Sequence, residues 1–244
     1  MKLIQNAFAF LPTLLLMAFG HSSFVEKINI FSFNDPVILL ADNKTPAEDT
    51  DEFLRWNLKS SGLSYGAFEQ AQKGYHYFLH SKMLQKSNLL TIIDYSKPSS
   101  QKRLYVLDMN SGNILFNTWV AHGRNSGYNY ATEFSNDEES HKTSLGFYIT
   151  QNTYTGINGY SLKLKGCEKG INDKATERAI VFHGAEYVSE SFIREHGYLG
   201  RSYGCPAIPL MISKKIIDKI KNGTCMFLYH PTKKYIVRSK ILNS

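Results

Sequence analysis

The sequence predicts a mainly β domain with a few helices. Two patterns support this fold class: short β-like runs dominate the chain beyond residue 87, and helical periodicity is confined to a few segments. Composition agrees, because 43% of the 244 residues are hydrophobic and 20% are charged, a balance that can bury a core and differs from that of disordered chains. A chain of this length most simply forms one main core.

The N-terminal segment has the pattern of a secretory signal peptide. One positive charge follows the first methionine, an apolar stretch runs from about Ala7 to Phe19, and the small residues Ala18 and Gly20 have the spacing of a cleavage site. The stretch is short for a membrane-spanning helix. We therefore expect residues 1–20 to direct export to the periplasm or cell envelope. An uncleaved segment could instead hold the protein loosely at a membrane.

Residues 21–60 are predicted to be a linker, because the composition shifts there to Asn, Asp, Pro, Lys and Thr around few apolar residues. Residues 61–87 are predicted to form an α-helical N-terminal extension, with Ser64 placed to cap the helix. Its apolar face repeats at three- and four-residue intervals, at Phe68, Ala71, Tyr75, Phe78 and Leu79. We expect this face to pack on the main core.

Residues 88–244 form the predicted main domain, in which β-like runs alternate with turns. The runs are Leu89–Tyr95, Leu104–Met109, Ile114–His122, Leu145–Thr150, Ser161–Leu164, Ala179–His183 and Cys225–His230. Turn residues at 110–113 and 156–159 separate two pairs of strands. Helical spacing returns at Ser189–Glu195 and at Pro209–Lys221. These elements predict a compact β-rich core with helices around it.

Basic residues outnumber acidic ones by 28 to 21, which gives a net charge of +7. They are scattered and form no basic block or interleaved aromatic motif, so we expect no nucleic-acid partner. The charge fits anionic surroundings, such as carboxylate-rich wall polymer or anionic lipid, and it fits simple solubility equally well.

Three cysteines, Cys167, Cys205 and Cys225, cannot all pair within one chain. In an oxidising compartment at least one thiol therefore stays free. If Cys205 is the free thiol, Cys167 and Cys225 could close a disulfide. Alternatively both are reduced, with Cys225 a core residue of an apolar strand and Cys167 in an exposed loop.

A histidine and a cysteine with glycine neighbours are the strongest candidates for catalysis. His183 ends a predicted strand and precedes Gly184, and Cys205 follows Gly204. A free thiol, with a pKa of about 8.5, is mostly protonated near neutrality and needs a base, usually histidine. Glycines let backbone N–H groups approach a developing oxyanion. The pattern predicts acyl transfer with Cys205 as nucleophile and His183 as base.

Other histidines and cysteines have alternative interpretations. His122 could line the same cleft, although a structural role is the commoner one for such a residue, and His141 is expected in a solvated loop. A module that catalyses nothing could use Cys205, Cys225, His183 and His230 as zinc ligands. The chain lacks the short-spaced ligand pairs of structural zinc sites, so we expect no metal and no cofactor.

A series of short motifs between about Leu104 and Tyr229 carries a family resemblance. In chain order they are Phe134-Ser135-Asn136, Ser144-Leu145-Gly146-Phe147-Tyr148, Tyr154-Thr155-Gly156, Gly159-Tyr160-Ser161-Leu162, Asn172-Asp173, Arg178-Ala179-Ile180-Val181, His183-Gly184-Ala185, Tyr187-Val188-Ser189 and the run from Leu199 to Pro209. In these motifs the chain resembles the murein L,D-transpeptidases with a YkuD-like catalytic domain, in the branch described as the second such domain.

The resemblance implies a β-sandwich-like catalytic domain, a thioester acyl-enzyme on Cys205, and His183 as the base, with its other ring nitrogen held by a backbone carbonyl. It also implies the peptidoglycan stem peptide as substrate. In this chemistry the thiolate attacks the carbonyl at the L-centre of the diamino acid, expels D-alanine and passes the acyl group to an amine. Water as acceptor would give an L,D-carboxypeptidase instead. A non-catalytic wall-binding module is the other alternative.

The nucleophile motif departs from the common family pattern of Ser/Thr-His-Gly-Cys, an apolar residue, then Arg or Asn. Ser202, Gly204 and Cys205 match it, whereas Tyr203 replaces the histidine and Ala207 takes the Arg or Asn position. A neighbouring arginine could supply the missing guanidinium to a stem carboxylate. The residues expected to bind the substrate or the oxyanion are Arg201, Ser202, Tyr203, Gly204 and Gly184.

Overall fold

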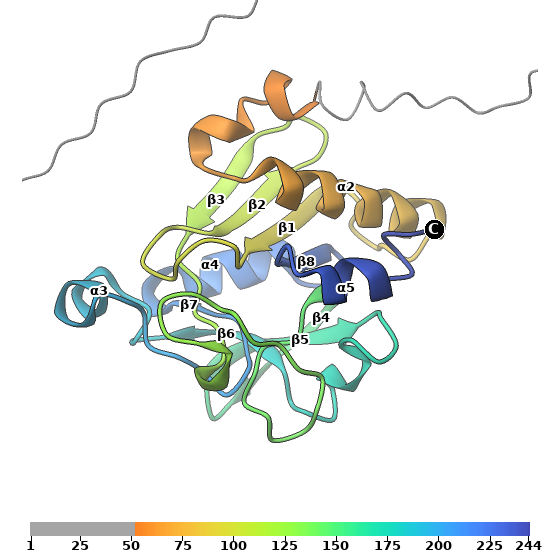
Figure 1. Cartoon of the computed structure of the whole chain (residues 1–244). Coiled ribbons are helices and arrows are strands. Elements are labelled where there is room, and N and C mark those ends of the chain that lie inside the picture. Colours follow the sequence, from red (N-terminus) through yellow and green to blue (C-terminus); the bar gives the residue numbers. More distant parts are fainter. Residues whose placement is uncertain (1–51) are drawn as a thin grey trace, which may run out of the picture. The chain divides into compact units, whose positions relative to one another are not determined.

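The structure is a computed structural model that describes residues 52–244 (Figure 1). The predicted signal peptide at residues 1–20 lies outside the described residues, as does most of the predicted linker. The segment predicted to associate loosely with a membrane lies outside them too. Within residues 52–244, no helix combines the length and the apolar character needed to cross a membrane.

The strands of the described chain form one eight-stranded sheet, in the order β3-β2-β1-β8-β4-β5-β6-β7. Their bounds are β1 Leu89–Asp94, β2 Leu104–Asp108, β3 Ile114–Thr118, β4 Gly146–Gly156, β5 Gly159–Gly166, β6 Val181–Ala185, β7 Ala207–Pro209 and β8 Cys225–Tyr229. The pairs β1–β8 and β6–β7 are parallel. Helix α2 (Tyr65–His80) lies along β1 and β2 on one side of the molecule (Figure 1). The predicted mainly β fold with a few helices is confirmed, and its strands are hydrogen-bonded into one continuous sheet.

The larger helices lie where periodicity predicts them, at α2 Tyr65–His80, α3 Glu190–His196 and α4 Leu210–Ile220. Helix α2 begins after Ser64 because its hydroxyl accepts the N–H of Ala67, as an N-cap residue does. Ser189 caps α3 in the same way. The buried face of α2 packs against β1 and β8.

The last residues of the predicted linker are folded in the structure. Residues 52–55 are helical and Leu58–Ser61 form a 3-10 helix. Phe53 and Leu58 are buried in the core. Phe53 meets the ring of Tyr65 edge-on at 5.4 Å between centroids. Burial of these two apolar side chains binds residues 52–61 to α2, so this part of the predicted linker is folded.

The sequence did not predict strand β7 or helix α5 (Lys233–Arg238). Strand β7 has only 3 residues and pairs with distant β6, so no local periodicity reveals it. Helix α5 is held by the buried carboxylate of Glu168, which accepts hydrogen bonds from the hydroxyls of Tyr235 and Ser239. The N–H of Phe147 in β4 donates to the same carboxylate. One buried acid thus joins the C-terminal helix to the sheet.

Candidate active site

Strands β6 and β7 bring the two predicted catalytic residues to neighbouring segments. His183 in β6 pairs with Ala207 of β7 in parallel register, and Cys205 lies two positions before Ala207. The N–H of His183 also faces the carbonyl of Pro206 at 3.4 Å. The turn that carries Cys205 therefore runs directly beside β6.

The thiol of Cys205 lies against the start of β6. The residue is 8% exposed. Its Sγ accepts the N–H of Val181 at 3.4 Å and donates toward the carbonyl of Ala179 at 3.7 Å. Burial raises the pKa of the thiol, whereas the N–H of Val181 and the charge of Arg178 act in the opposite direction. The resting thiol is neutral, so it needs a base to act as a nucleophile.

His183 has the tautomer that a general base requires. Its Nδ1 lies 3.0 Å from the carbonyl oxygen of Gly184. Because a carbonyl only accepts, Nδ1 carries the proton, and Nε2 of the neutral ring keeps its lone pair. Burial lowers the pKa of His183, and the bond to Gly184 offsets part of that shift. The ring is therefore neutral at neutral pH, and the structure contains the carbonyl contact that the resemblance implied.

Arg178 holds the loop of residues 135–144 next to the nucleophile. Its guanidinium donates to that loop at distances from 2.6 to 3.3 Å, and the partners are the carbonyls of Ser135 and Lys142 and the hydroxyls of Ser140 and Ser144. A Cβ on Gly204 would lie 3.3 Å from Nη2 of Arg178. The cation therefore stands beside Cys205, where it favours the thiolate. Arg178 lies in one of the motifs that carry the family resemblance, and its role becomes visible only in these contacts.

Ser202 and Gly204 shape the turn that presents Cys205. The Ser202 hydroxyl donates to the carbonyl of Cys205 at 2.6 Å and accepts the N–H of Gly204 at 3.0 Å. Gly204 has a φ of 121°, which side chains other than glycine rarely adopt. Both residues are thus engaged within the turn, and the predicted role for Gly204 as an oxyanion donor would require its N–H to leave Ser202.

Gly184 has a packing role in this structure. A Cβ at this position would lie 2.5 Å from the hydroxyl oxygen of Ser213 and 3.0 Å from a methyl carbon of Leu210. The glycine therefore lets α4 pack directly on β6. This packing explains why a glycine stands here, and the predicted oxyanion role of Gly184 stays a prediction.

Tyr203 and Arg201 lie at the surface beside the turn. Tyr203 is 65% exposed, and its ring lies 4.5 Å from that of His141. His141 lies in a loop, as predicted, where it is partly exposed and its ring contacts that of Tyr203. Arg201 donates to the backbone carbonyls of Arg124 and Gly127. Its guanidinium also lies over the rings of Tyr128 and Tyr198. Its guanidinium is thus held locally.

His122 is a fully buried structural residue. Its Nδ1 lies 2.8 Å from Nη2 of Arg103, and its Nε2 lies 3.3 Å from the carbonyl of Gly127. Because arginine only donates, Nδ1 accepts and Nε2 carries the proton. Burial and the charge of Arg103 lower the pKa of His122 to about 3. Both ring nitrogens are occupied, so the suggestion that His122 lines the cleft is wrong.

The cysteines Cys167, Cys205 and Cys225 are free thiols. Cys225 lies in β8 and Cys167 directly follows β5, with β4 between those strands. Neighbouring strands lie about 4.8 Å apart, so two such spacings separate the two cysteines. That separation is larger than the roughly 7 Å between Cα atoms that a disulfide can bridge. The alternative of a Cys167–Cys225 disulfide is therefore wrong. Strands β4 and β5 also separate Cys225 from His183, so the four ligands of the zinc alternative do not come together.

A cavity of about 570 Å³ borders the loop that Arg178 holds. Ser135, Lys142 and Ser144 line it and also contact Arg178. Neither Cys205 nor His183 lines this cavity, so it is separate from the candidate chemistry.

The comparison with protein families finds one match: the L,D-transpeptidase catalytic domain, over residues 59–229. The match begins well before Leu104, where the motifs of the sequence begin, and it includes α2. The helix predicted to be an N-terminal extension thus belongs to the matched region. No curated protein matches the sequence.

Solved structures that match this chain include three L,D-transpeptidases. One from Mycobacterium tuberculosis is 12% identical, with a TM-score of 0.39 and coverage of 59% of this chain and 58% of that chain. One from Mycobacterium smegmatis is 12% identical, with a TM-score of 0.36 and coverage of 59% of each chain. One from Xylanimonas cellulosilytica is 15% identical, with a TM-score of 0.36 and coverage of 58% and 60%. The chain thus spans about three fifths of these structures, and the family assignment rests on the family match.

Proposed function

This chain belongs to the L,D-transpeptidase catalytic domain family, and from that premise we propose that it transfers acyl groups of peptidoglycan stem peptides through a thioester on Cys205. The observation that supports this best is the state of His183. Its Nδ1 proton is fixed by the carbonyl of Gly184 at 3.0 Å, which leaves Nε2 as an acceptor in a ring that burial keeps neutral.

In the first half-reaction, Nε2 of His183 accepts the thiol proton as Sγ of Cys205 attacks the carbonyl at the L-centre of the diamino acid. The new C–S bond gives a tetrahedral oxyanion. This intermediate collapses by breaking the C–N bond to D-alanine, whose nitrogen takes the proton from His183. The products are the thioester and free D-alanine.

In the second half-reaction, an acceptor amine attacks the thioester carbonyl and gives its proton to His183. The C–S bond breaks, and the departing sulfur of Cys205 recovers the proton. Water in place of the amine would yield a shortened stem peptide, which is the carboxypeptidase alternative.

Local charge supports this assignment of roles. Burial disfavours a separated thiolate and imidazolium, so we propose that proton transfer accompanies the attack and does not precede it. The N–H of Val181 and the cation of Arg178 stabilise the negative charge that develops on sulfur. Arg178 acts here as a positioning residue that also supplies charge.

We also propose that the reaction takes place in the periplasm or cell envelope. The support is the apolar stretch of residues 7–19 with the small residues Ala18 and Gly20 at its end, which has the features of an export signal. Peptidoglycan, the proposed substrate, lies outside the cytoplasmic membrane.

Intact mass after incubation with a stem tetrapeptide tests the reaction class. The wild-type chain should gain the mass of the acyl tripeptide and release D-alanine, whereas Cys205→Ala should gain nothing. Addition of an amine-bearing stem peptide should then give cross-linked dimers. Shortened monomers alone would identify a carboxypeptidase, and the absence of any adduct would refute the proposal.

A further inference from the structure

Exposed aromatic rings and two arginines form a strip on the surface beside the Cys205 turn. This Tyr–Arg strip consists of Tyr203, Arg124, Arg201, Tyr128 and Tyr198. Tyr203 and Tyr128 are 65% and 67% exposed. Large aromatic side chains that gather at a surface mark binding sites more often than isolated ones do. The proposed cysteine chemistry does not use the strip.

Cation–π contacts set the positions of the rings. The guanidinium of Arg201 lies 4.3 Å from the ring centre of Tyr128 and 5.6 Å from that of Tyr198. The guanidinium of Arg124 lies 5.6 Å from the ring centre of Tyr203. Arg201 also donates to the carbonyl of Arg124 at 3.3 Å, which joins the two halves. Rings that are held before a ligand arrives lose less entropy on binding.

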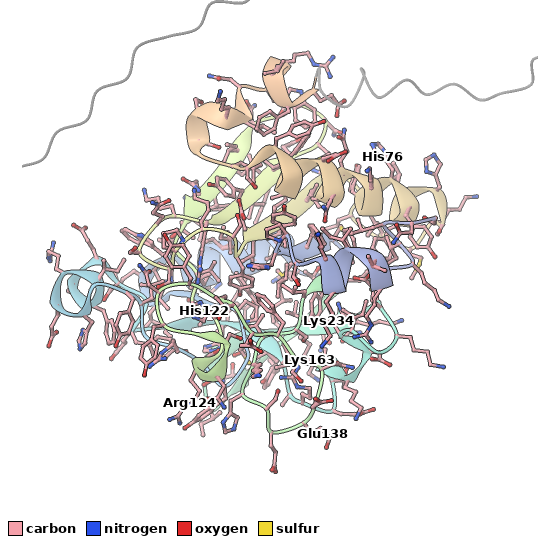
Figure 2. All side chains as sticks on the ribbon, viewed as in Figure 1. His76, His122, Arg124, Glu138, Lys163 and Lys234 are labelled. Carbon is pink, nitrogen blue, oxygen red and sulfur yellow. The ribbon has the colours of Figure 1, made fainter. Side chains whose placement is uncertain are left out.

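Backbone pairing places the strip against the nucleophile turn. Gly123 forms a parallel bridge with Ser202, and the N–H of Arg124 donates to the carbonyl of Ser202 at 2.7 Å. Tyr203 lies two positions before Cys205. Figure 2 shows Arg124 at the rim of the fold, whereas His122, two positions earlier, lies inside it. A ligand on the strip would therefore lie next to the turn that presents the thiol.

We propose that the Tyr–Arg strip binds the glycan strand that carries the stem peptide. This inference rests on the proposed function, which makes that polymer the substrate. Sugar rings present apolar C–H faces that stack on aromatic rings. Their hydroxyl and N-acyl oxygens accept hydrogen bonds from arginine. Binding of the glycan would hold the attached peptide near Cys205 and raise the effective concentration of its carbonyl there.

A bare polyanion matches the strip less well than a sugar chain does. Three of the five members are tyrosines, which carry no charge at neutral pH. The guanidinium of Arg201 is already engaged by two carbonyls and two rings. The exposed surface of the strip is therefore chiefly aromatic, as stacking on sugar rings requires.

Binding of purified, peptide-free glycan strands to the full chain with Cys205→Ala tests the proposal, with the dissociation constant measured by calorimetry. Combined Tyr128→Ala and Tyr203→Ala should weaken binding about tenfold or more, since loss of central aromatic anchors has effects of that size. Combined Tyr128→Phe and Tyr203→Phe should retain most of the affinity because the rings remain. Tyr77→Ala, at a residue 39% exposed on α2, is the matched control and should bind normally.

The outcomes separate this proposal from the proposed function, because the binding assay needs no turnover. Absence of glycan binding would overturn the inference, as would equal affinity of the double alanine variant and the Tyr77→Ala control. Binding that disappears with salt or with Arg124→Gln, yet survives loss of both rings, would identify a polyanion surface and overturn it as well. Failure of the tetrapeptide to acylate the wild-type chain would instead count against the thioester.

Discussion

Two of the three His-Gly pairs in this chain, His122-Gly123 and His183-Gly184, have buried rings with opposite ring chemistry. Both histidines are buried, and burial lowers the pKa of each. His122 accepts a hydrogen bond at Nδ1 from Arg103, so its proton lies on Nε2. His183 donates from Nδ1 to a carbonyl, so Nε2 is left with its lone pair. The ring of His122 is therefore a structural hydrogen-bond acceptor, whereas the ring of His183 can act as a base.

The group that is hydrogen-bonded to Nδ1 therefore decides the role of a buried histidine. Burial makes both rings neutral, and glycine follows both, so neither feature distinguishes them. An arginine accompanies each region as well. Arg103 donates to the ring of His122, whereas Arg178 stands beside the cysteine and leaves the ring of His183 free of that contact.

The largest expected effect is that of Cys205→Ala, which should abolish thioester formation because the nucleophile is lost. The substitution removes a single sulfur atom from the side chain, so the fold should remain. Intact mass after incubation with tetrapeptide and thermal unfolding check the two statements. An adduct of normal yield on the variant would remove Cys205 from the mechanism.

His183→Gln should slow thioester formation by on the order of a hundredfold or more, the scale of general-base loss. His122→Gln should leave that rate near the wild-type value in the folded enzyme and lower its stability, because Arg103 loses an acceptor, at a cost of about 1–3 kcal/mol. Single-turnover rates by mass spectrometry, with thermal unfolding alongside, give both numbers. Equal rate losses in the two variants would break the contrast.

The pH profile of thioester formation sharpens the same assignment. Because burial lowers the pKa of His183, the wild-type rate should rise with pH below about 6.5 and be level above it, until other groups titrate. His183→Gln should show no such rise. A wild-type rise centred above pH 7 would contradict a buried, neutral base.

His122 should make the fold sensitive to acid. Its folded pKa of about 3 lies below the unfolded value of about 6.5, so the unfolded chain takes up the proton first as the pH falls. The stability is present above pH 6.5 and should decrease by about 1.2 kcal/mol between pH 6 and pH 5 from this residue alone. Urea unfolding at the two pH values measures the change. His122→Gln should remove this part of the pH dependence.

Arg178→Gln should raise the pKa of Cys205 and slow thioester formation several-fold, up to about tenfold, at neutral pH, because a cation that favours the thiolate is lost. The pH profile of alkylation of Cys205 by iodoacetamide reports this electrostatic role, which a purely structural residue would not affect. Arg178→Lys should recover part of the shift. An unchanged alkylation profile in Arg178→Gln would show that Arg178 does not affect the pKa of Cys205 and that its role is to hold the loop.

The smallest expected effect concerns the other thiols. Denatured protein should contain three reactive thiols per chain, because all three cysteines are free. A reductant should therefore leave the melting temperature unchanged. A count of one thiol would show that Cys167 and Cys225 had paired, against the strand order that separates them.

The sequence by itself determined the elements whose signals are local. Ser64 marked a helix start because its hydroxyl caps an N–H group only three residues away. The turns at 110–113 and 156–159 marked the hairpins β2–β3 and β4–β5. The candidate site was also visible, because His183 and Cys205 lie in motifs whose residue types define the chemistry.

Only the tertiary structure decided how those residues are used. The tautomers of His122 and His183 depend on which group meets Nδ1, and the Arg103 that meets His122 lies just before β2, 19 residues earlier in the chain. Strand β7 exists only through its pairing with β6, and the separation of Cys167 from Cys225 follows from the placement of β4 between their strands. Periodicity and capping encode which face is buried and where an element begins. The partner across a contact comes from distant chain segments, and folding alone brings those together.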